Sequence, residues 1–240
     1  MKILILTDNE FIYENLNEII NDGIYQKDDF YFFYSPNNLK FKEKYKDISF
    51  TALSIKDNLN EIINKYDMIF SLHCKQIFPE KLVTAMRCIN IHPGFNPFNR
   101  GYYPQVYSIL NKLPVGVTIH EMDALLDHGP VILQEQVIID PWDTSYDVYK
   151  KIQLKEVELL SNNLRNIIDN NYTALAVPEG NLNMKKDFDN LCEIDLNKMV
   201  TFREAIDFLR AMTFNGYRNS YYTDDQGHKI YVEIKLDKAD

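Results

Sequence analysis

Two hydrophobic periods alternate along the first half of the chain. Short apolar runs of the kind that form buried strands occupy residues 2–7, 30–34, 48–54, 68–73 and 87–92. Segments with the 3.6-residue spacing of amphipathic helices lie among them, at residues 9–21, 58–65, 79–86 and 104–111. This repeated order predicts an α/β fold with a parallel-rich sheet and helices on both of its faces.

The pattern changes after residue 114. Two strands are predicted with no helix between them, at residues 115–122 and 130–139, and a long helix follows at 144–168. Residues 170–195 contain Pro, Gly and many Asn and Asp side chains, and they predict a connecting arm.

The last part of the chain carries its own signals. Thr201 with Glu204 three residues later is a capping-box pattern, which opens a predicted helix that reaches about Met212. The turn sequence at residues 224–227 lies between two short strand-like runs and predicts a hairpin. We therefore divide the chain into three parts: a catalytic α/β domain (1–169), a connecting arm (170–198) and a small C-terminal helix with a β-hairpin (199–240).

Composition and charge restrict the partners. The chain has 240 residues, of which 45% are hydrophobic, and a formal net charge of −9. It can build a sizeable core, but it lacks the broad basic face that nucleic-acid binding usually needs. The three cysteines are odd in number and widely spaced, as expected for reduced thiols, and no apolar run is long enough for a signal peptide or a membrane span. We predict a cytoplasmic protein with no nucleic-acid or membrane partner.

The stretch CINIHPGFNPFNRGYYP (residues 88–104) ends a predicted strand with two polar side chains. Asn90 and His92 are two residues apart, so they share one face of the strand, at the end where open α/β sheets bind ligands. Asp127 follows in a loop between two later strands, where a turn aspartate is the ordinary interpretation. An imidazole beside a carboxylate and an amide donor would suit acyl-type transfer, but polar capping of the strand explains Asn90 and His92 equally well.

Two other kinds of site are not favoured. Residues 1–22 contain no glycine, so neither G-x-G-x-x-G nor a P-loop follows the first strand. Possible zinc ligands are spread along the chain: His73, His92, His120, Asp127 and His128. No HxH or HxxxH spacing connects them, and we therefore expect no metal site.

Five elements occur in order within residues 68–145: Asn90–His92, Pro97, Arg100–Gly101, Gly116–Asp123 and Asp127–Pro130. Together they resemble the signature of formyltransferases that use N10-formyltetrahydrofolate as co-substrate. The resemblance implies a Rossmann-like fold for the N-terminal domain, with Asn90, His92 and Asp127 as the catalytic set. In those roles His92 accepts a proton from the attacking amine, Asn90 donates to the oxyanion, and Asp127 orients His92 and helps to relay a proton.

Within this family, the chain resembles the sugar N-formyltransferases. The loop 92–101 and the segment 119–123 carry that likeness, and residues 209–217 with the hairpin resemble the C-terminal part of enzymes that act on dTDP-amino sugars. The resemblance implies formyl transfer to a dTDP-linked amino-dideoxy sugar, in O-antigen or other surface-polysaccharide biosynthesis, by a homodimer. The favoured acceptor is dTDP-4-amino-4,6-dideoxyglucose. A 3-amino-3,6-dideoxy sugar, a UDP-sugar and formyl-folate hydrolysis stay open as alternatives.

Further binding residues are expected from the same resemblance. The residues expected to bind the folate are Leu72, His73, Ile77, Met122 and Asp123. Those expected to bind the nucleotide-linked amino sugar are Lys75, Pro93, Gly94, Asn96, Arg100, Tyr103, Arg210, Asn215 and Tyr222. From the residues alone, Lys75 is equally a solvated surface lysine, and Arg100 and Tyr222 are equally packing residues. Methionyl-tRNA formylation is disfavoured by the acidic charge and the short C-terminal part.

Overall fold

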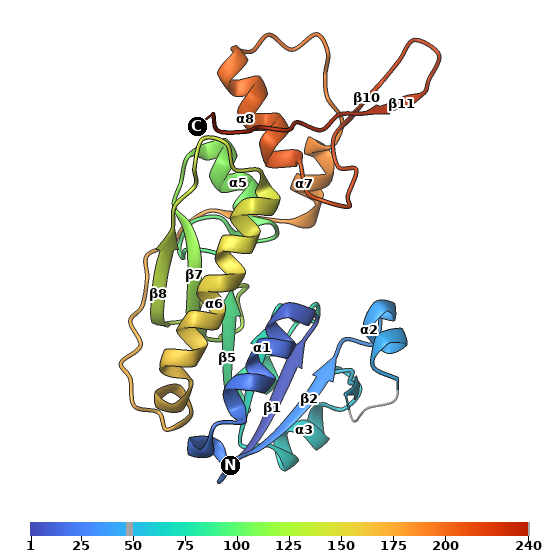
Figure 1. Ribbon diagram of the computed structural model, residues 1–240. Helices are drawn as coiled ribbons and strands as arrows, with labels where there is room; N and C mark the ends of the chain where they lie inside the picture. Colours follow the sequence, from blue (N-terminus) through green and yellow to red (C-terminus); the bar gives the residue numbers. More distant parts are fainter. Residues whose placement is uncertain (47–49, 240) are drawn as a thin grey trace.

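The computed structural model describes residues 1–46 and 50–239, and its described strands form one large sheet and two small ones (Figure 1). The large, seven-stranded sheet has the order β3-β2-β1-β4-β5-β7-β8. The bounds of these strands, in chain order, are β1 (Lys2–Thr7), β2 (Asp29–Tyr34), β3 (Thr51–Ala52), β4 (Met68–Leu72), β5 (Arg87–His92), β7 (Val115–Glu121) and β8 (Val131–Val137). Strands β3 to β5 in this order are parallel, whereas β7 is antiparallel to β5 and β8 to β7. The predicted α/β class with a parallel-rich sheet is confirmed.

Helices cover both faces of this sheet. Their bounds are α1 (Glu10–Ile20), α2 (Leu39–Lys44), α3 (Leu59–Lys65), α4 (Glu80–Ala85), α5 (Pro104–Asn111) and α6 (Ser145–Ile168). On β1, Ile3 and Ile5 point into the layer of α1, α5 and α6, while Leu4 and Leu6 point into the layer of α3 and α4. Because β1 is buried on both faces, its sequence is a continuous apolar run and does not alternate.

Local chemistry fixes where the helices begin. Asn9 caps α1 by accepting a hydrogen bond from the Ile12 N–H, and Thr144 with Asp147 forms a capping box at α6. Helix α2 and the 3₁₀ turn η1 (Gly23–Tyr25) were not predicted, since they are too short to show a period. The predicted strand 48–54 is reduced to β3, and Ile48 and Ser49 lie outside the described residues.

The segment predicted as a connecting arm contains two further elements. They are β9 (Leu182–Asn183) and α7 (Lys185–Leu191). Strand β9 pairs in parallel with β6 (Arg100–Gly101), which belongs to the loop after β5. A two-residue strand and a helix of less than two turns leave no periodic signal, so the pairing of this segment with the loop after β5 could not be predicted.

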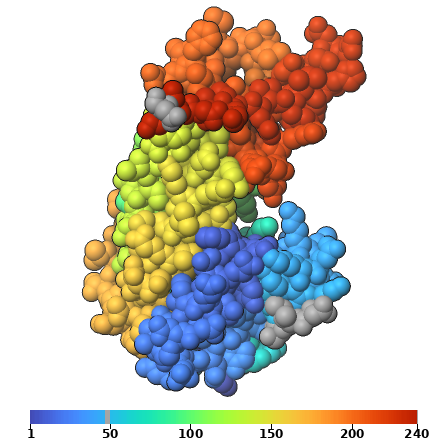
Figure 2. Space-filling view, in the orientation of Figure 1, coloured from blue at the N-terminus to red at the C-terminus, as the bar shows by residue number. Residues whose placement is uncertain are grey.

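The C-terminal part consists of α8 (Phe202–Met212) and a hairpin of β10 (Tyr221–Thr223) and β11 (Lys229–Tyr231). The predicted capping box of Thr201 and Glu204 is present. Helix α8 packs beside α5, and the hairpin projects away from the sheet (Figure 1). The face drawn in Figure 2 is hollowed between this orange-to-red part and the blue N-terminal part. Among the described residues, no helix combines the length and hydropathy of a membrane span.

Candidate active site

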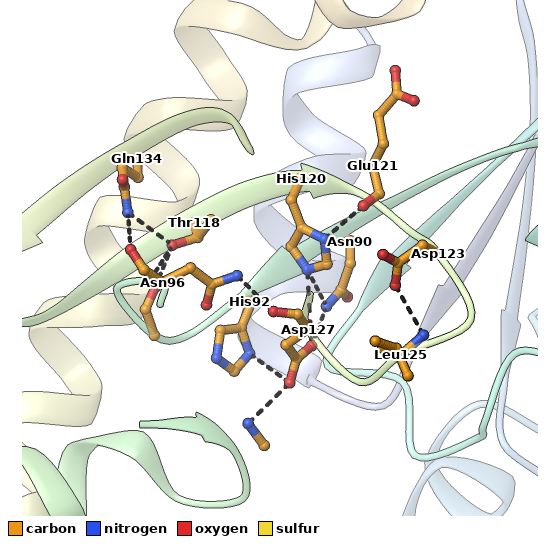
Figure 3. A network of polar contacts seen from close by, with 12 residues as sticks. Asn90, His92, Asn96, Thr118, His120, Glu121, Asp123, Leu125, Asp127 and Gln134 are labelled. Atoms are coloured by element: carbon orange, nitrogen blue, oxygen red, sulfur yellow. Dashed lines mark hydrogen bonds and ion pairs between the residues drawn. The ribbon is translucent and has the colours of Figure 1, made fainter. Parts of the chain in front are cut away.

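Asn90, His92 and Asp127 meet at the carboxyl end of β5 (Figure 3). The Asn90 amide donates from Nδ2 to Asp127 Oδ1 at 2.9 Å. His92 Nδ1 lies 3.5 Å from Asp127 Oδ2. The carboxylate therefore faces the amide with one oxygen and the imidazole with the other, which brings together the three residues predicted as the catalytic set.

The backbone around Asp127 holds its carboxylate in place. Asp127 adopts a left-handed conformation with φ of +48°, and its carbonyl oxygen accepts a hydrogen bond from Asn96 Nδ2 at 2.8 Å. The Gly101 N–H donates to Asp127 Oδ2 at 3.1 Å. Two loops from distant parts of the chain thus fix one side chain, as an orienting carboxylate requires.

Burial and neighbouring charges set the pKa values of His92 and Asp127. Burial lowers the pKa of His92 below its ordinary value of 6.5, and the attraction of Asp127 opposes this only in part. Burial alone would raise the pKa of Asp127, but His92 and His120 together with the Gly101 N–H lower it to about 2. With Nδ1 directed at the carboxylate, His92 Nε2 is buried without a partner among the described residues. The site therefore holds a neutral imidazole with a free lone pair beside an ionised carboxylate.

His120 is a fourth member of the site that the sequence analysis did not select. It stands directly opposite Asn90 where β5 and β7 pair, and Thr118 stands opposite His92. His120 Nδ1 donates to the Glu121 carbonyl at 2.8 Å, so Nε2 accepts from Asn90 Nδ2 at 3.2 Å. This bond fixes which end of the Asn90 amide faces the carboxylate. Two polar residues on one face of an otherwise apolar strand were the available signal.

The loop after β5 packs tightly against His92. A Cβ atom at Gly94 would collide with the His92 imidazole, so only glycine fits there. Thr118 Oγ1 donates to the Gly94 carbonyl at 2.8 Å and accepts from the Asn96 N–H at 3.0 Å. Gln134 donates to the Asn96 carbonyl at 3.0 Å. The β7–β8 pair thereby supports the floor of the loop.

The arm supports the other side of the same loop. The Asn181 carbonyl accepts from the Arg100 N–H at 3.1 Å, and the Asn183 carbonyl from the Tyr102 N–H at 2.8 Å. Gly101, with φ of +87°, lies so close that an added Cβ would be 2.5 Å from the Asn183 carbonyl oxygen. Asn181 and Asn183, about 80 positions later in the chain, therefore position the Gly101 N–H that donates to Asp127.

Comparison with known proteins identifies the family of this chain. The family model "Formyl transferase" matches residues 35–164, and a model for the N-formyltransferase dimerization C-terminal domain matches residues 187–238. A dTDP-4-amino-4,6-dideoxyglucose formyltransferase of Mycobacterium bovis is 46% identical over 184 residues, which are 76% of this chain and 79% of the relative. The chain belongs to the formyltransferase family.

Two solved structures extend the likeness to the whole chain. A 4-N formyltransferase from Francisella tularensis superposes with a TM-score of 0.95 at 46% identity, covering 99% of this chain and 98% of the other. A sugar N-formyltransferase from a Shewanella species gives 0.96 at 38% identity, covering 100% and 99%. The predicted membership is confirmed, and this formyltransferase shares the C-terminal part as well as the catalytic domain with them.

The residues predicted to bind folate gather at the ends of β4 and β7. Leu72 is buried and pairs with Ile91, His73 follows it in a left-handed conformation, and Ile77 is 88% exposed. Met122 donates its N–H to the Cys88 carbonyl, and Asp123 binds His128 and the Leu125 N–H. Strand pairing thus places Leu72 and His73 beside the catalytic strand.

The loop residues predicted to bind substrate differ in burial and in their contacts. Arg100 is buried, with its Nη2 3.0 Å from Glu179 Oε2 and its Nε without a partner among the described residues. Tyr103 begins α5 and packs against Phe188 of α7 with ring centroids 4.3 Å apart. The Lys75 N–H donates to Asp8 at 2.9 Å.

The C-terminal residues predicted to bind substrate have other contacts. Arg210 is buried, and it donates to Asp207 and to the carbonyls of Asp140 and Asp143, so its donors tie α8 to the loop before α6. Asn215 hydrogen-bonds Tyr146 and lowers the pKa of that phenol. Tyr222 is half-buried in β10. None of these three contacts the catalytic set.

Proposed function

We propose that this formyltransferase moves the formyl group of N10-formyltetrahydrofolate to the amino group of dTDP-4-amino-4,6-dideoxyglucose. The observation that carries the proposal is the buried, neutral His92 with one bare ring nitrogen, held between Asp127 and Asn90. The substrate follows from the relative that is 46% identical over 76% of this chain and bears that substrate in its name. Use of the product in surface polysaccharide, in the cytoplasm, belongs to the same proposal.

His92 serves as the general base. The neutral amine adds to the formyl carbon, and His92 Nε2 accepts the proton that the amine nitrogen loses. The tetrahedral intermediate then collapses: the bond from the formyl carbon to N10 breaks, and a proton passes to N10, which leaves tetrahydrofolate. Asp127 stabilises the imidazolium between these steps and holds its Nδ1–H.

Asn90 serves as the oxyanion donor. Its two amide hydrogens point to Asp127 Oδ1 at 2.9 Å and to His120 Nε2 at 3.2 Å. A developing oxyanion takes over the longer of these bonds, because a charged acceptor binds the hydrogen more strongly than a neutral imidazole does. His120 keeps the amide in the required orientation until then.

Binding of the two substrates is assigned to the two sides of His92. Folate binds at the end of β4, with Leu72, His73, Ile77, Met122 and Asp123. The amino sugar is assigned to the loop after β5, with Pro93, Gly94, Asn96, Arg100 and Tyr103. Its nucleotide is assigned to Lys75, Arg210, Asn215 and Tyr222, of which Arg210 already donates to Asp207 and to the carbonyls of Asp140 and Asp143. Arg100 supports this division, because it is a buried cation with one donor unpaired among the described residues.

A homodimer through the C-terminal part belongs to the proposal. Phe202 and Ile206 of α8, and Met199 just before it, are exposed apolar side chains, with Met199 95% and Phe202 92% exposed. Large apolar side chains with this exposure are typical of contact surfaces, and the matching domain model is named for dimerization. Light scattering at micromolar concentration is expected to give twice the chain mass, and a Phe202→Glu variant to give the monomer.

Release of tetrahydrofolate, measured with and without acceptor, tests the function. We expect release only when an amino sugar is present, fastest with dTDP-4-amino-4,6-dideoxyglucose in a panel of dTDP- and UDP-linked 3-amino and 4-amino sugars. Equal release without acceptor would indicate a hydrolase. Preference for a 3-amino sugar or for UDP would keep the reaction and change the substrate.

A further inference from the structure

A second buried histidine–carboxylate pair lies next to the catalytic set and takes no part in the chemistry above. His73 Nε2 is 2.9 and 2.8 Å from the two carboxylate oxygens of Glu156, whose side chain in α6 is fully buried. The Tyr149 hydroxyl lies 3.2 Å from His73 Nδ1, and Asn9 Nδ2 donates to that hydroxyl at 2.9 Å. Two side chains of α6 therefore hold His73, and Asn9, which caps α1, holds one of them.

The directions of these hydrogen bonds follow from the groups themselves. Asn9 Nδ2 can only donate, so the Tyr149 oxygen accepts and its own hydrogen is directed to His73 Nδ1. His73 Nε2–H then donates to Glu156, which can only accept as a carboxylate. Both ring nitrogens of His73 are occupied, so this histidine is not available as a base.

The pair fixes the first residue of the loop between β4 and α4 (residues 73–79). His73 has φ of +57°, which few residues other than glycine adopt without support. The next contacts are backbone bonds: Asp8 accepts the Lys75 N–H at 2.9 Å, and Gln76 binds the Ile55 N–H and the Leu53 carbonyl, each at 2.9 Å. Ile77 follows at once and is 88% exposed.

We propose that Glu156 and His73 are positioning residues for the formyl donor. They hold the loop in the form that presents Ile77 as an apolar wall for the ring system of tetrahydrofolate. A large apolar side chain on a loop tied at His73, Lys75 and Gln76 has no packing role within the described chain, but it gains burial when a flat heterocycle covers it. The inference rests on the proposed use of a folate donor at this end of the sheet.

The Glu156→Gln variant tests this positioning, with Glu158→Gln as the matched control. Glu158 is exposed on the same helix and pairs with Lys155 at the surface. We expect Glu156→Gln to raise KM for N10-formyltetrahydrofolate about tenfold, because the hydrogen bond from His73 to a charged carboxylate becomes a weaker one to a neutral amide. The acceptor KM and the kcat at saturating donor should stay within about twofold, and Glu158→Gln should change nothing. Equal loss in all three constants, or an unchanged donor KM, overturns the inference.

Two milder variants keep the test decisive if Glu156→Gln does not fold. Tyr149→Phe removes only the hydroxyl and keeps the ring that packs on Phe214. His73→Asn removes the imidazole, while asparagine tolerates the left-handed backbone. Both should raise the donor KM in the same direction, and a double variant of His73→Asn with Glu156→Gln should be no worse than either single change. Additive effects would contradict a shared role.

Direct binding separates this inference from the proposed function. The unreactive 5-formyltetrahydrofolate is titrated against the full chain and each variant by calorimetry. If the unaltered protein does not bind it, the folate assignment itself fails. If it binds the unaltered protein and Glu156→Gln with equal affinity, the function stands and the positioning role falls.

Discussion

Two buried histidine–carboxylate pairs stand at the ends of neighbouring strands and differ in one respect. His73, after β4, has partners on both ring nitrogens, with Glu156 on one side and Tyr149 on the other. His92, at the end of β5, faces Asp127 with Nδ1, and its Nε2 has no partner in the part of the chain that the structure describes. A fully bonded imidazole is a structural link, whereas one free lone pair in a buried site is what a general base needs. The number of occupied ring nitrogens distinguishes the two histidines.

Removal of the free nitrogen should have the largest effect. His92→Asn keeps a polar side chain but no base, and we expect kcat to fall by about 10²- to 10⁴-fold. Binding of the dTDP-sugar, measured by calorimetry, should change little because the base acts mainly on the bound amine. Turnover like that of the unaltered protein would contradict the assignment of His92 as the base.

The second-largest effect on kcat is expected from moving the Gly101 N–H, which donates a hydrogen bond to Asp127. Gly101→Ala places a methyl group against the Asn183 carbonyl and moves the N–H that Asp127 accepts. Loss of a hydrogen bond to a charged group should lower kcat by between about 10- and 100-fold in a steady-state assay.

The control for this change is Gly227→Ala. Gly227 has φ of +85° and open space around its Cα, so alanine there brings the same backbone strain without a collision. Its kcat should match that of the unaltered protein. A similar loss in both variants would show that strain, and not the position of Asp127, caused the effect.

The pH dependence of kcat/KM should report the protonation of His92. His92 must be neutral to accept a proton, and burial lowers its pKa below 6.5. The profile of kcat/KM should therefore be level with respect to this group above pH 6.5, and below the lowered pKa it should fall about tenfold per pH unit.

His128 provides the matched control for that profile. Its hydrogen bond to Asp123 raises its pKa, and it lies near the surface. A His128→Gln variant should keep the acidic limb where it is. An acidic limb centred above pH 7, or one that moves with His128, would contradict the assignment to His92.

The exposed partner of Arg100 should matter least. Glu179 is 71% exposed and lies between Arg100 and His128. Exposed ion pairs contribute little, so Glu179→Gln should change kcat and the acceptor KM by less than about threefold in the same assay. A tenfold change would mean that this pair, although exposed, sets the position of the Arg100 guanidinium.

Much of the site could be predicted because its signals are local. Asn90 and His92 share a strand face by spacing alone, and Asp127 follows in a turn-type sequence. His120 and Thr118 share one face of an apolar strand, but their partners depend on the antiparallel pairing of β7 with β5, which no local pattern encodes. Glu156 lies between Ile152 and Leu160 on the buried side of α6, but that spacing does not reveal its partner His73.

The sequence by itself determined the α/β class and the order of the main strands and helices, since periodicity and spacing act over a few residues. The candidate catalytic set came from the resemblance to formyltransferases and not from periodicity. Only the tertiary structure decided which ring nitrogen of His92 lacks a partner among the described residues. It also decided that β9 pairs with β6 beside Gly101, and that both ring nitrogens of His73 have hydrogen-bond partners. Those features arise between residues tens of positions apart, where burial and hydrogen-bond partners depend on how the whole chain packs.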